Sequence, residues 1–375
     1  MWNFYNPVRL HVGEAWLPQI NALLAALRPG KPLVGIITYE VFATLPESPL
    51  QAVISHLKDV PYAVFDQVEP EPSHATIMRG KAWAEAHNLT AIIAIGGGSV
   101  IDAAKAICCL AYTDLEITPI MNREIALAKK TLPLLAIPTT AGTGSEVTPF
   151  CVLTDQATGL KQSLGSPHFY PDLALLVPQF VATLPPHVIA DVGMDVLAHA
   201  FEAIWSVKSQ PISENLAFQA IRLAQEHFLP YFRNSRNLVA AAGMLEAAAI
   251  AGMAFSNTFT AACHALSFPI GKRFRLSHGA ACAMTLHLIA EVNLAAVKPK
   301  FDRLANALGL ADGAQIPAFI QQIHQQVHPI TMFHQLGGSQ EDLVKIAQGA
   351  FQPLLANNPV PLNEAKIVEV LAKVF

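Results

Sequence analysis

Apolar and polar positions follow different periods in the two halves of this chain. In the first half, short apolar runs bounded by turn residues alternate with stretches that carry apolar residues at helical spacing. The expected strands are residues 33–38, 62–65, 90–98, 132–140, 151–155 and 173–178, and the expected helices are 73–87 and 99–112. Strands that alternate with helices in this way predict a mostly parallel α/β sheet.

A proline-rich break at Leu184-Pro185-Pro186 marks the change to a helical pattern. The helices expected after it are residues 187–205, 211–229, 237–256, 279–296, 299–308, 314–327 and 339–350. The length of 375 residues also suggests more than one core. We therefore predict an α/β domain over residues 1–183 and an all-α helical domain over residues 184–375.

The composition and charge of the chain argue against a nucleic-acid-binding or membrane-spanning protein. The chain is 52% hydrophobic and 14% charged, with a net charge of −4, and it contains no Lys/Arg-rich run, so we expect no nucleic-acid partner. The apolar stretch 238–255 contains Glu246 and two glycines, which favours a buried helix over a membrane span of about 20 apolar residues. The N-terminus lacks a signal-peptide pattern, and the five cysteines show no CxxC spacing. These features predict a cytoplasmic protein with free, mostly buried thiols, and so apolar a chain is expected to form a dimer or larger homo-oligomer.

A glycine-rich turn directly follows the expected strand 90–98. Gly96, Gly97, Gly98 and Ser99 lead into the next expected helix. Glycines let the backbone approach a phosphate closely, and a helix N-terminus offers free N–H groups to an anion. Ser99 is a candidate N-cap or phosphate donor, and Asp102 could contact a ribose or nicotinamide amide, or offset the helix dipole. The alternative is a tight strand–helix turn without a ligand.

A second polar loop, residues 138–146, follows the expected strand 132–140. It contains Thr139, Thr140 and Thr143 among its hydroxyl and glycine residues. Such a loop alone is usually a solvated connection. Two such loops, each at the end of a buried strand, favour a nucleotide site at the carboxyl ends of the strands.

A set of metal-ligand side chains lies in the helical half. Asp195 and His199 are four residues apart, so they share one face of a helix, and His264 and His278 follow farther along the chain. Three imidazoles and one carboxylate suit Fe²⁺, Zn²⁺ or Mn²⁺. Taken singly, each histidine would more often be a core or capping residue.

Several segments occur in a distinctive order and spacing: GGGSVIDAAKA, PTTAGTGSEVT, LPPHVIADVGMDVLAHAFEA, AGMAFSNTFTAACHAL and RLSHGAA. Together they resemble the iron-containing (group III) alcohol dehydrogenase family, and the resemblance extends to about residue 310. It implies an N-terminal dinucleotide-binding α/β domain and a C-terminal helical domain. It also implies a metal ion, often Fe²⁺, held by Asp195, His199, His264 and His278.

The same resemblance implies NAD or NADP as the cofactor. Gly97, Gly98 and Ser99 match its pyrophosphate turn, and Lys161 matches a lysine that reaches the cofactor ribose. The loop that flanks the diphosphate and nicotinamide is matched by Thr139, Thr140 and Thr143.

The sequence departs from the family pattern at three places. Many relatives end the first strand with Thr-Asp, whose carboxylate binds the adenosine ribose, whereas this chain has Thr38-Tyr39-Glu40. Glu71 replaces a common asparagine and could bind the ribose hydroxyls, so the choice between NAD and NADP stays open. Many relatives carry a second histidine four residues after the third metal ligand, where it is thought to help proton transfer, and this chain has Phe268 there.

The expected function is metal-dependent oxidoreduction between an alcohol and an aldehyde or ketone, by hydride transfer with NAD(P). The basic residues 272, 273 and 275 could recognise an anionic aldehyde, or could simply be solvated. One alternative is a metalloenzyme like dehydroquinate synthase or glycerol-phosphate dehydrogenase. Another is a catalytically degenerate metal- or nucleotide-binding protein, which Phe268 would favour.

Overall fold

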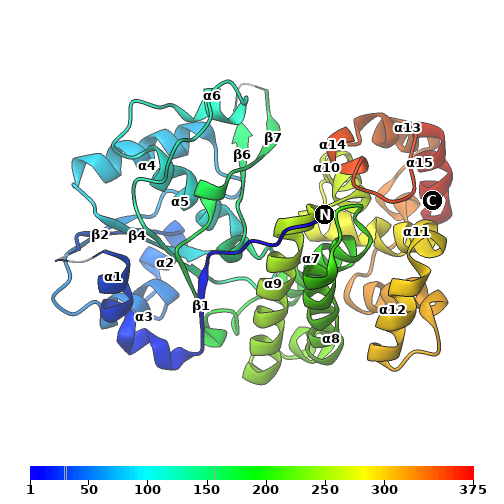
Figure 1. The fold of residues 1–375 in the computed structure, drawn as a ribbon, viewed down its shortest axis with the longest axis horizontal. Helices are drawn as coiled ribbons and strands as arrows, with labels where there is room; N and C mark the ends of the chain where they lie inside the picture. Colours follow the sequence, from blue (N-terminus) through cyan, green and yellow to red (C-terminus); the bar gives the residue numbers. More distant parts are fainter. Residues whose placement is uncertain (29, 31, 157) are drawn as a thin grey trace. The chain divides into compact units, whose positions relative to one another are not determined.

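The computed structural model describes residues 1–375 except for residues 29, 31 and 157 and the side chain of residue 160. It contains two compact units, which can be followed by colour in Figure 1. The α/β unit comprises Asn6–Thr140 and Gly144–Val181, and the helical unit comprises Met1–Tyr5, Ala141–Thr143 and Ala182–Phe375. A parallel α/β sheet followed by a helical part confirms the predicted fold class. The domain limits 1–183 and 184–375 stay a prediction, because compactness does not test independent folding.

The α/β unit is built on a six-stranded parallel sheet with the order β1-β8-β5-β4-β2-β3. Its strands are β1 (Arg9–Val12), β2 (Val34–Ile37), β3 (Tyr62–Phe65), β4 (Ala91–Gly96), β5 (Leu134–Pro138) and β8 (Leu173–Leu176). The register pairs Gly96 of β4 with Pro138 of β5, so the glycine-rich turn and the threonine-rich loop leave the sheet at the same edge. The sequence pattern did not predict β1, because this edge strand, RLHV, has no buried residue.

Helices cover both faces of the sheet, which explains the continuous apolar runs of its central strands. Ile36, Ile93 and Leu135 pack into one core with α1 (Ile20–Leu27) and α3 (Pro49–His56). The alternate residues of the same strands pack into a second core with α4 (His74–Ala86) and α5 (Gly98–Leu110). Figure 1 shows these two pairs of helices on opposite sides of the strands. The short helices α2 (Glu40–Thr44) and α6 (Ile117–Met121) complete the helices of this unit among the described residues.

The expected strand 151–155 lies outside the parallel sheet. It forms β6 (Phe150–Asp155), which pairs antiparallel with β7 (Leu160–Gly165) as a separate two-stranded sheet. The sequence pattern did not predict β7, because LKQSLG has only two apolar positions. Cys151 and Leu153 of β6 are buried against the α5 side of the unit.

The helical unit follows the predicted pattern, with some helices added and two joined. Its longer helices are α7 (Pro186–Trp205), α8 (Pro211–Arg233), α9 (Leu238–Thr258), α10 (Ala262–Phe274), α11 (His278–Leu308), α12 (Ile316–Val327), α13 (Gln340–Gly349) and α15 (Glu364–Leu371), with the one-turn α14 (Gln352–Leu355) between the last two. Helices α10, α14 and α15 are not among the predicted helices. The two helices expected over 279–296 and 299–308 are one helix that continues through Pro299, because a proline removes one backbone donor while buried Val297 and Phe301 anchor both sides.

Two helices, α9 and α11, are long and apolar enough to cross a membrane by length and composition. In each, 67% of the most apolar window is buried inside the structure. They are core helices of the helical unit, as predicted for residues 238–255.

Candidate metal centre and cofactor turn

Helix α7 presents the first two predicted metal ligands. Asp195 and His199 are one helical turn apart, and both side chains are buried. The distance between His199 Nε2 and Asp195 Oδ1 is 3.7 Å. The helical face expected from the sequence spacing is therefore present.

Helices α10 and α11 bring two further histidines to the same carboxylate. His264 Nε2 lies 3.6 Å and His278 Nε2 lies 3.7 Å from Asp195 Oδ1. These distances exceed a hydrogen bond. They are close to the distance of about 3.3–3.4 Å that separates two ligand atoms bound to one tetrahedral zinc-like ion. Ligand atoms of Asp195, His264, His278 and Cys282 all lie within 4.8 Å of one another.

The unpaired polar atoms of this cluster indicate that it fits a cation. Asp195 Oδ1 and His264 Nε2 are buried and have no hydrogen-bond partner among the described residues. A buried polar atom without a partner costs free energy, and a carboxylate oxygen costs the most. A divalent ion bound between these atoms would remove that cost, so the donor set fits a metal.

Glu202, which the sequence interpretation missed, fixes the orientation of His264. Its fully buried carboxylate accepts backbone N–H bonds from Ala261 (2.8 Å) and Cys263 (2.6 Å), and its Oε2 lies 2.6 Å from His264 Nδ1. A carboxylate on Nδ1 holds the proton there and turns Nε2 toward the metal position. The available signal was spacing, since Glu202 follows His199 by three residues on the same helix face.

The electrostatics of the cluster are dominated by its two buried carboxylates. Burial would raise the pKa of Asp195, but the facing imidazoles of His199, His264 and His278 hold it below its usual value. Burial would lower the pKa of His264, but Glu202 and Asp195 outweigh burial and raise it to about 9. For His199, burial wins and lowers the pKa to about 3. The negative field at His264 is the field that a bound cation needs.

The glycine-rich turn lies at the carboxyl end of β4, as predicted. Helix α5 begins at Gly98 with Gly97 as its N-cap, so the expectation that Ser99 caps this helix is wrong. Instead, Ser99 Oγ accepts the backbone N–H of Glu71 at 3.1 Å. The reason is that the helix starts as soon as the strand ends, which places Ser99 in the first turn.

Tyr39 lies against the same turn. Burial raises the pKa of its hydroxyl, while interactions with Ser99 and with backbone groups of Gly97 and Val100 lower it. A bound phosphate at this helix N-terminus would need the same backbone N–H groups. A Cβ added at Gly97 would lie 3.3 Å from Tyr39 Oη and 3.2 Å from Thr140 Cγ2, so a larger residue would fill this space.

Two other predicted cofactor residues, Lys161 and Glu71, form an ion pair with each other. Lys161 Nζ lies 2.6 Å from Glu71 Oε1, and both side chains are exposed. In the threonine-rich loop, the Thr139 backbone N–H donates to Gly96 O at 3.0 Å, which joins that loop to the glycine-rich turn. Thr143 is grouped with the helical unit. The cofactor roles of Gly96, Gly97, Gly98, Ser99, Asp102, Thr139, Thr140, Thr143, Lys161, Tyr39 and Glu71 stay predictions.

Comparison with known proteins assigns both halves of the chain to one family. Residues 7–178 match the model of the iron-containing alcohol dehydrogenases, and residues 189–375 match the C-terminal model of the Fe-containing alcohol dehydrogenase family. The chain belongs to the iron-containing alcohol dehydrogenase family. It is therefore an alcohol/aldehyde oxidoreductase that uses NAD(P), and Asp195, His264 and His278 form its divalent-metal site.

Individual relatives of this chain differ in substrate. It is 34% identical over 329 residues to the 1-propanol dehydrogenase PduQ of Salmonella typhimurium, covering 84% of this chain and 85% of the relative. It is 32% identical over 327 residues to choline dehydrogenase of Bacillus subtilis, covering 83% and 81%. A structure of sulfoacetaldehyde reductase from Bifidobacterium kashiwanohense in complex with NAD⁺ superposes with a TM-score of 0.94 at 29% identity, covering 100% of this chain and 98% of the other.

Aromatic side chains lie beside the metal site. The ring of Phe255 stacks on His199 with 4.0 Å between ring centroids. The ring of Phe268 lies 6.3 Å from that of His278, the ligand whose side chain is 40% exposed. Phe268 thus lies beside the accessible ligand.

Asp102 is part of a buried network. Its carboxylate accepts from Ser145 Oγ at 2.5 Å and from the Val152 backbone N–H at 2.9 Å, and Lys105 Nζ lies 3.4 Å away. Lys105 is fully buried and also donates to Phe150 O at 2.7 Å. The sequence interpretation missed Lys105, whose helical position beside Asp102 was the only signal. These contacts join α5 to β6.

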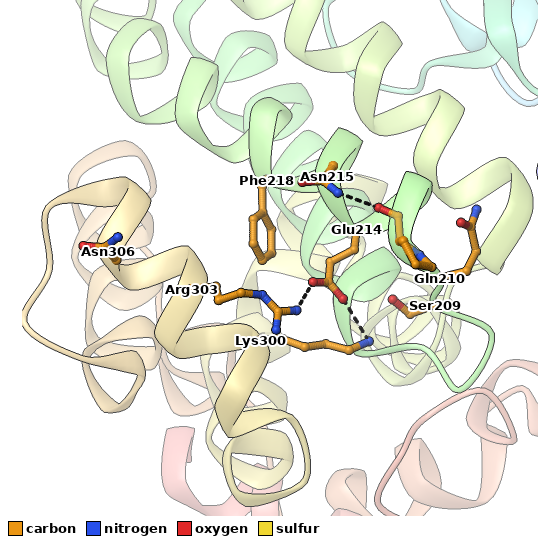
Figure 2. Close-up of a pocket in the computed structure, with 9 residues that line it drawn as sticks. Ser209, Gln210, Glu214, Asn215, Phe218, Lys300, Arg303 and Asn306 are labelled. Atoms are coloured by element: carbon orange, nitrogen blue, oxygen red, sulfur yellow. Dashed lines mark hydrogen bonds and ion pairs between the residues drawn. The ribbon is translucent and has the colours of Figure 1, made fainter.

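A cavity of about 620 Å³ lies between helices α8 and α11 and contains none of the predicted site residues. Figure 2 shows that Glu214 lies between its two cationic side chains, Lys300 and Arg303, and forms an ion pair with each. The charges are therefore compensated within the cavity wall. The converging ligands of the metal site make that site, and not this cavity, the candidate for catalysis.

Proposed function

We propose that this chain interconverts a small alcohol and its aldehyde, with a divalent ion held by Asp195, His199, His264 and His278. The observation that carries the proposal is the convergence of the buried, unpaired Asp195 Oδ1 and His264 Nε2 with His278 Nε2. When bound, the metal would polarise the substrate oxygen as a Lewis acid, and the nicotinamide would carry the hydride.

The chain's own residues would prepare this site. Glu202 keeps the His264 Nδ1 proton in place, so that Nε2 faces the ion. Phe255 and Phe268 place apolar rings beside His199 and His278. Phenylalanine cannot transfer a proton, so the proton of the alcohol would leave through water, a cofactor hydroxyl or another histidine.

We assign cofactor binding to the glycine-rich turn Gly96–Ser99 and to Thr139, Thr140 and Thr143. The N-terminus of α5 would bind the diphosphate, and Lys161 would contact the ribose. We propose NAD as the preferred cofactor, because Glu71, whose backbone N–H donates to Ser99 Oγ, brings an acidic residue to this turn, where its charge would disfavour a 2′-phosphate. Among similar structures, the sulfoacetaldehyde reductase is in complex with NAD⁺.

The substrate class we propose is an uncharged short aldehyde. Of the basic residues 272, 273 and 275, Arg273 is bound by Asp342, with Nε–Oδ1 at 2.5 Å and a second contact at 2.9 Å. This pairing reduces the positive charge available to an anionic substrate. Relatives that act on 1-propanol, as in PduQ, support the uncharged class.

The test is metal analysis of anaerobically purified protein, followed by oxidation of NADH and NADPH across an aldehyde panel that includes anionic members. We expect about one divalent ion per chain and NADH oxidation with uncharged aldehydes. A protein that binds metal and oxidises neither cofactor with any aldehyde would contradict the enzyme proposal. Preference for an anionic aldehyde would replace the proposed substrate class.

His264→Ala separates the enzyme from a binding protein. An enzyme loses metal and activity together, whereas a degenerate binding protein loses at most stability. Activity on a phosphorylated polyol would instead favour the alternative related to glycerol-phosphate dehydrogenase. The cytoplasmic location and the homodimer stay predictions.

A further inference from the structure

Cys282 shares a helix face with a metal ligand and points into the same cluster. It follows His278 by four residues on α11, so the two side chains are one turn apart. The thiol is fully buried, and its Sγ lies 3.9 Å from His278 Nε2. All five cysteines are free, and Cys282 is the one whose sulfur converges with the metal ligands in the described part of the chain.

The distance between the Cys282 sulfur and the His278 nitrogen is compatible with two ligands of one ion. A zinc-like ion with bonds of about 2.3 Å to sulfur and about 2.05 Å to nitrogen separates the two ligand atoms by about 3.6 Å. The observed 3.9 Å is close to this separation. The Cys282 sulfur and the ligand atoms of Asp195, His264 and His278 lie within 4.8 Å of one another, whereas His199 is not in this set.

The orientation of His278 is consistent with this arrangement. Its Nδ1 lies 3.4 Å from Ser267 Oγ, a hydroxyl that also donates to His264 O at 2.9 Å. Nε2 therefore faces Asp195 and Cys282. The sulfur and the imidazole approach the same point from one helix.

We propose that Cys282 supplies a further, thiolate ligand to the ion held by Asp195, His199, His264 and His278, and that this chain thereby favours zinc over iron. The inference rests on the metal site of the proposed function. On binding, the Cys282 S–H bond breaks heterolytically, a sulfur–metal bond forms and the proton leaves to solvent, with no change of oxidation state. A soft thiolate shifts preference toward zinc, while carboxylate and imidazole ligands also suit iron.

Cobalt substitution tests the sulfur–metal bond directly. Metal-free protein is titrated with Co²⁺ without oxygen, and the absorption spectrum is recorded. A bound Co²⁺ gives visible d–d bands, and a thiolate ligand adds a sulfur-to-cobalt charge-transfer band in the near ultraviolet. We expect both in the wild type, and complete loss of the near-ultraviolet band with retained d–d bands in Cys282→Ala and Cys282→Ser.

Cys263→Ala is the matched control, because Cys263 is also buried and directly precedes His264, yet its sulfur is outside the cluster. It should keep both sets of bands. d–d bands without the charge-transfer band in the wild type, or a charge-transfer band that survives in Cys282→Ala, overturn the role of Cys282 and leave the metal site standing. Failure of the wild type to bind Co²⁺ at all overturns the proposed metal site itself.

A competition experiment tests the consequence for metal choice. Metal-free wild type and Cys282→Ala are exposed to equal amounts of Zn²⁺ and Fe²⁺ without oxygen, and bound metal is measured by mass spectrometry. The zinc-to-iron ratio should fall in Cys282→Ala and stay unchanged in Cys263→Ala. An unchanged ratio in Cys282→Ala contradicts the proposed preference.

Discussion

The helical unit contains two histidine clusters that differ in charge. The metal cluster contains Asp195, His264 and His278, with ring centroids of the two histidines 5.2 Å apart. The second histidine cluster consists of His287, His324 and His328, whose neighbouring rings are 6.4 and 5.5 Å apart. Both clusters contain buried ring nitrogens without a hydrogen-bond partner among the described residues.

The carboxylates around them explain the difference. In the metal cluster, Asp195 and Glu202 raise the pKa of His264 to about 9 against the effect of burial. In the second cluster, burial lowers the pKa of His324 to about 3 and that of His287 to about 4. His287 and His324 line a cavity of about 520 Å³ among apolar residues such as Leu288 and Pro317. His264 therefore differs from His287 and His324 in the two buried carboxylates, Asp195 and Glu202, that face it.

Removing the charge of Asp195 should have the largest effect. Asp195→Asn keeps the shape but leaves the imidazoles without the carboxylate that faces all three, so we expect metal affinity to fall about 100-fold or more. Competition with a chromophoric chelator measures this affinity. Asp191→Asn is the matched control, because Asp191 lies four residues earlier on α7 and faces His328 of the second cluster at 3.6 Å. Equal losses in both variants would contradict the comparison.

Removing the charge of Glu202 should have the next largest effect. Glu202→Gln can still accept the backbone N–H bonds but places an amide N–H opposite His264 Nδ1, so the imidazole loses its fixed tautomer. We expect a loss of about 10- to 100-fold in metal affinity. Nitrogen NMR of the His264 ring should show a changed tautomer. An unchanged tautomer with lost affinity would mean that Glu202 acts on stability and not on orientation.

Acid should destabilise the protein through the second cluster. The folded pKa values of about 3 and about 4 lie below the ordinary 6.5, so the unfolded chain binds more protons as the pH falls from about 6.5 toward 4. The free energy of unfolding therefore keeps its full value above about pH 6.5 and falls as the pH decreases from there toward 4, because His324 must stay neutral in the folded protein. His324→Leu should reduce the slope of unfolding free energy against pH by about 1.4 kcal/mol per pH unit.

Denaturant unfolding at several pH values between 6.5 and 4.5 measures this slope. His187→Gln serves as the control, because His187 is exposed on the same unit. An identical slope in His324→Leu and wild type would show that His324 is not buried in its neutral form.

The smallest expected effect is that of the second cluster on metal content. The double variant His287→Gln, His324→Gln should bind as much zinc per chain as the wild type, because burial has a larger effect than any carboxylate on the pKa of both imidazoles. Metal analysis after dialysis against a small excess of zinc measures this. Loss of one bound ion per chain in the double variant would show that the second histidine cluster binds metal, and would contradict the proposed difference between the two clusters.

Much of the fold could be predicted because its signals are local. The strands 62–65 and 173–178 and the helix 211–229 are visible as continuous apolar runs or helical periods. The edge strand β1, the hairpin strand β7 and the continuity of α11 through Pro299 were not visible, since each depends on pairing or packing with distant residues.

The sequence by itself determined the alternation of strands and helices, the glycine-rich turn after β4 and the spacing of Asp195 and His199 on one helix face. Only the tertiary structure decided which side chains join them. Glu202 and Cys282 carried no more signal than an ordinary acid and an ordinary buried thiol, because their role depends on α7, α10 and α11 meeting at one point. A local sequence pattern predicts on which face of its own helix a side chain lies. A metal site depends on the distances between side chains of different helices, and these distances are set by the packing of the helices.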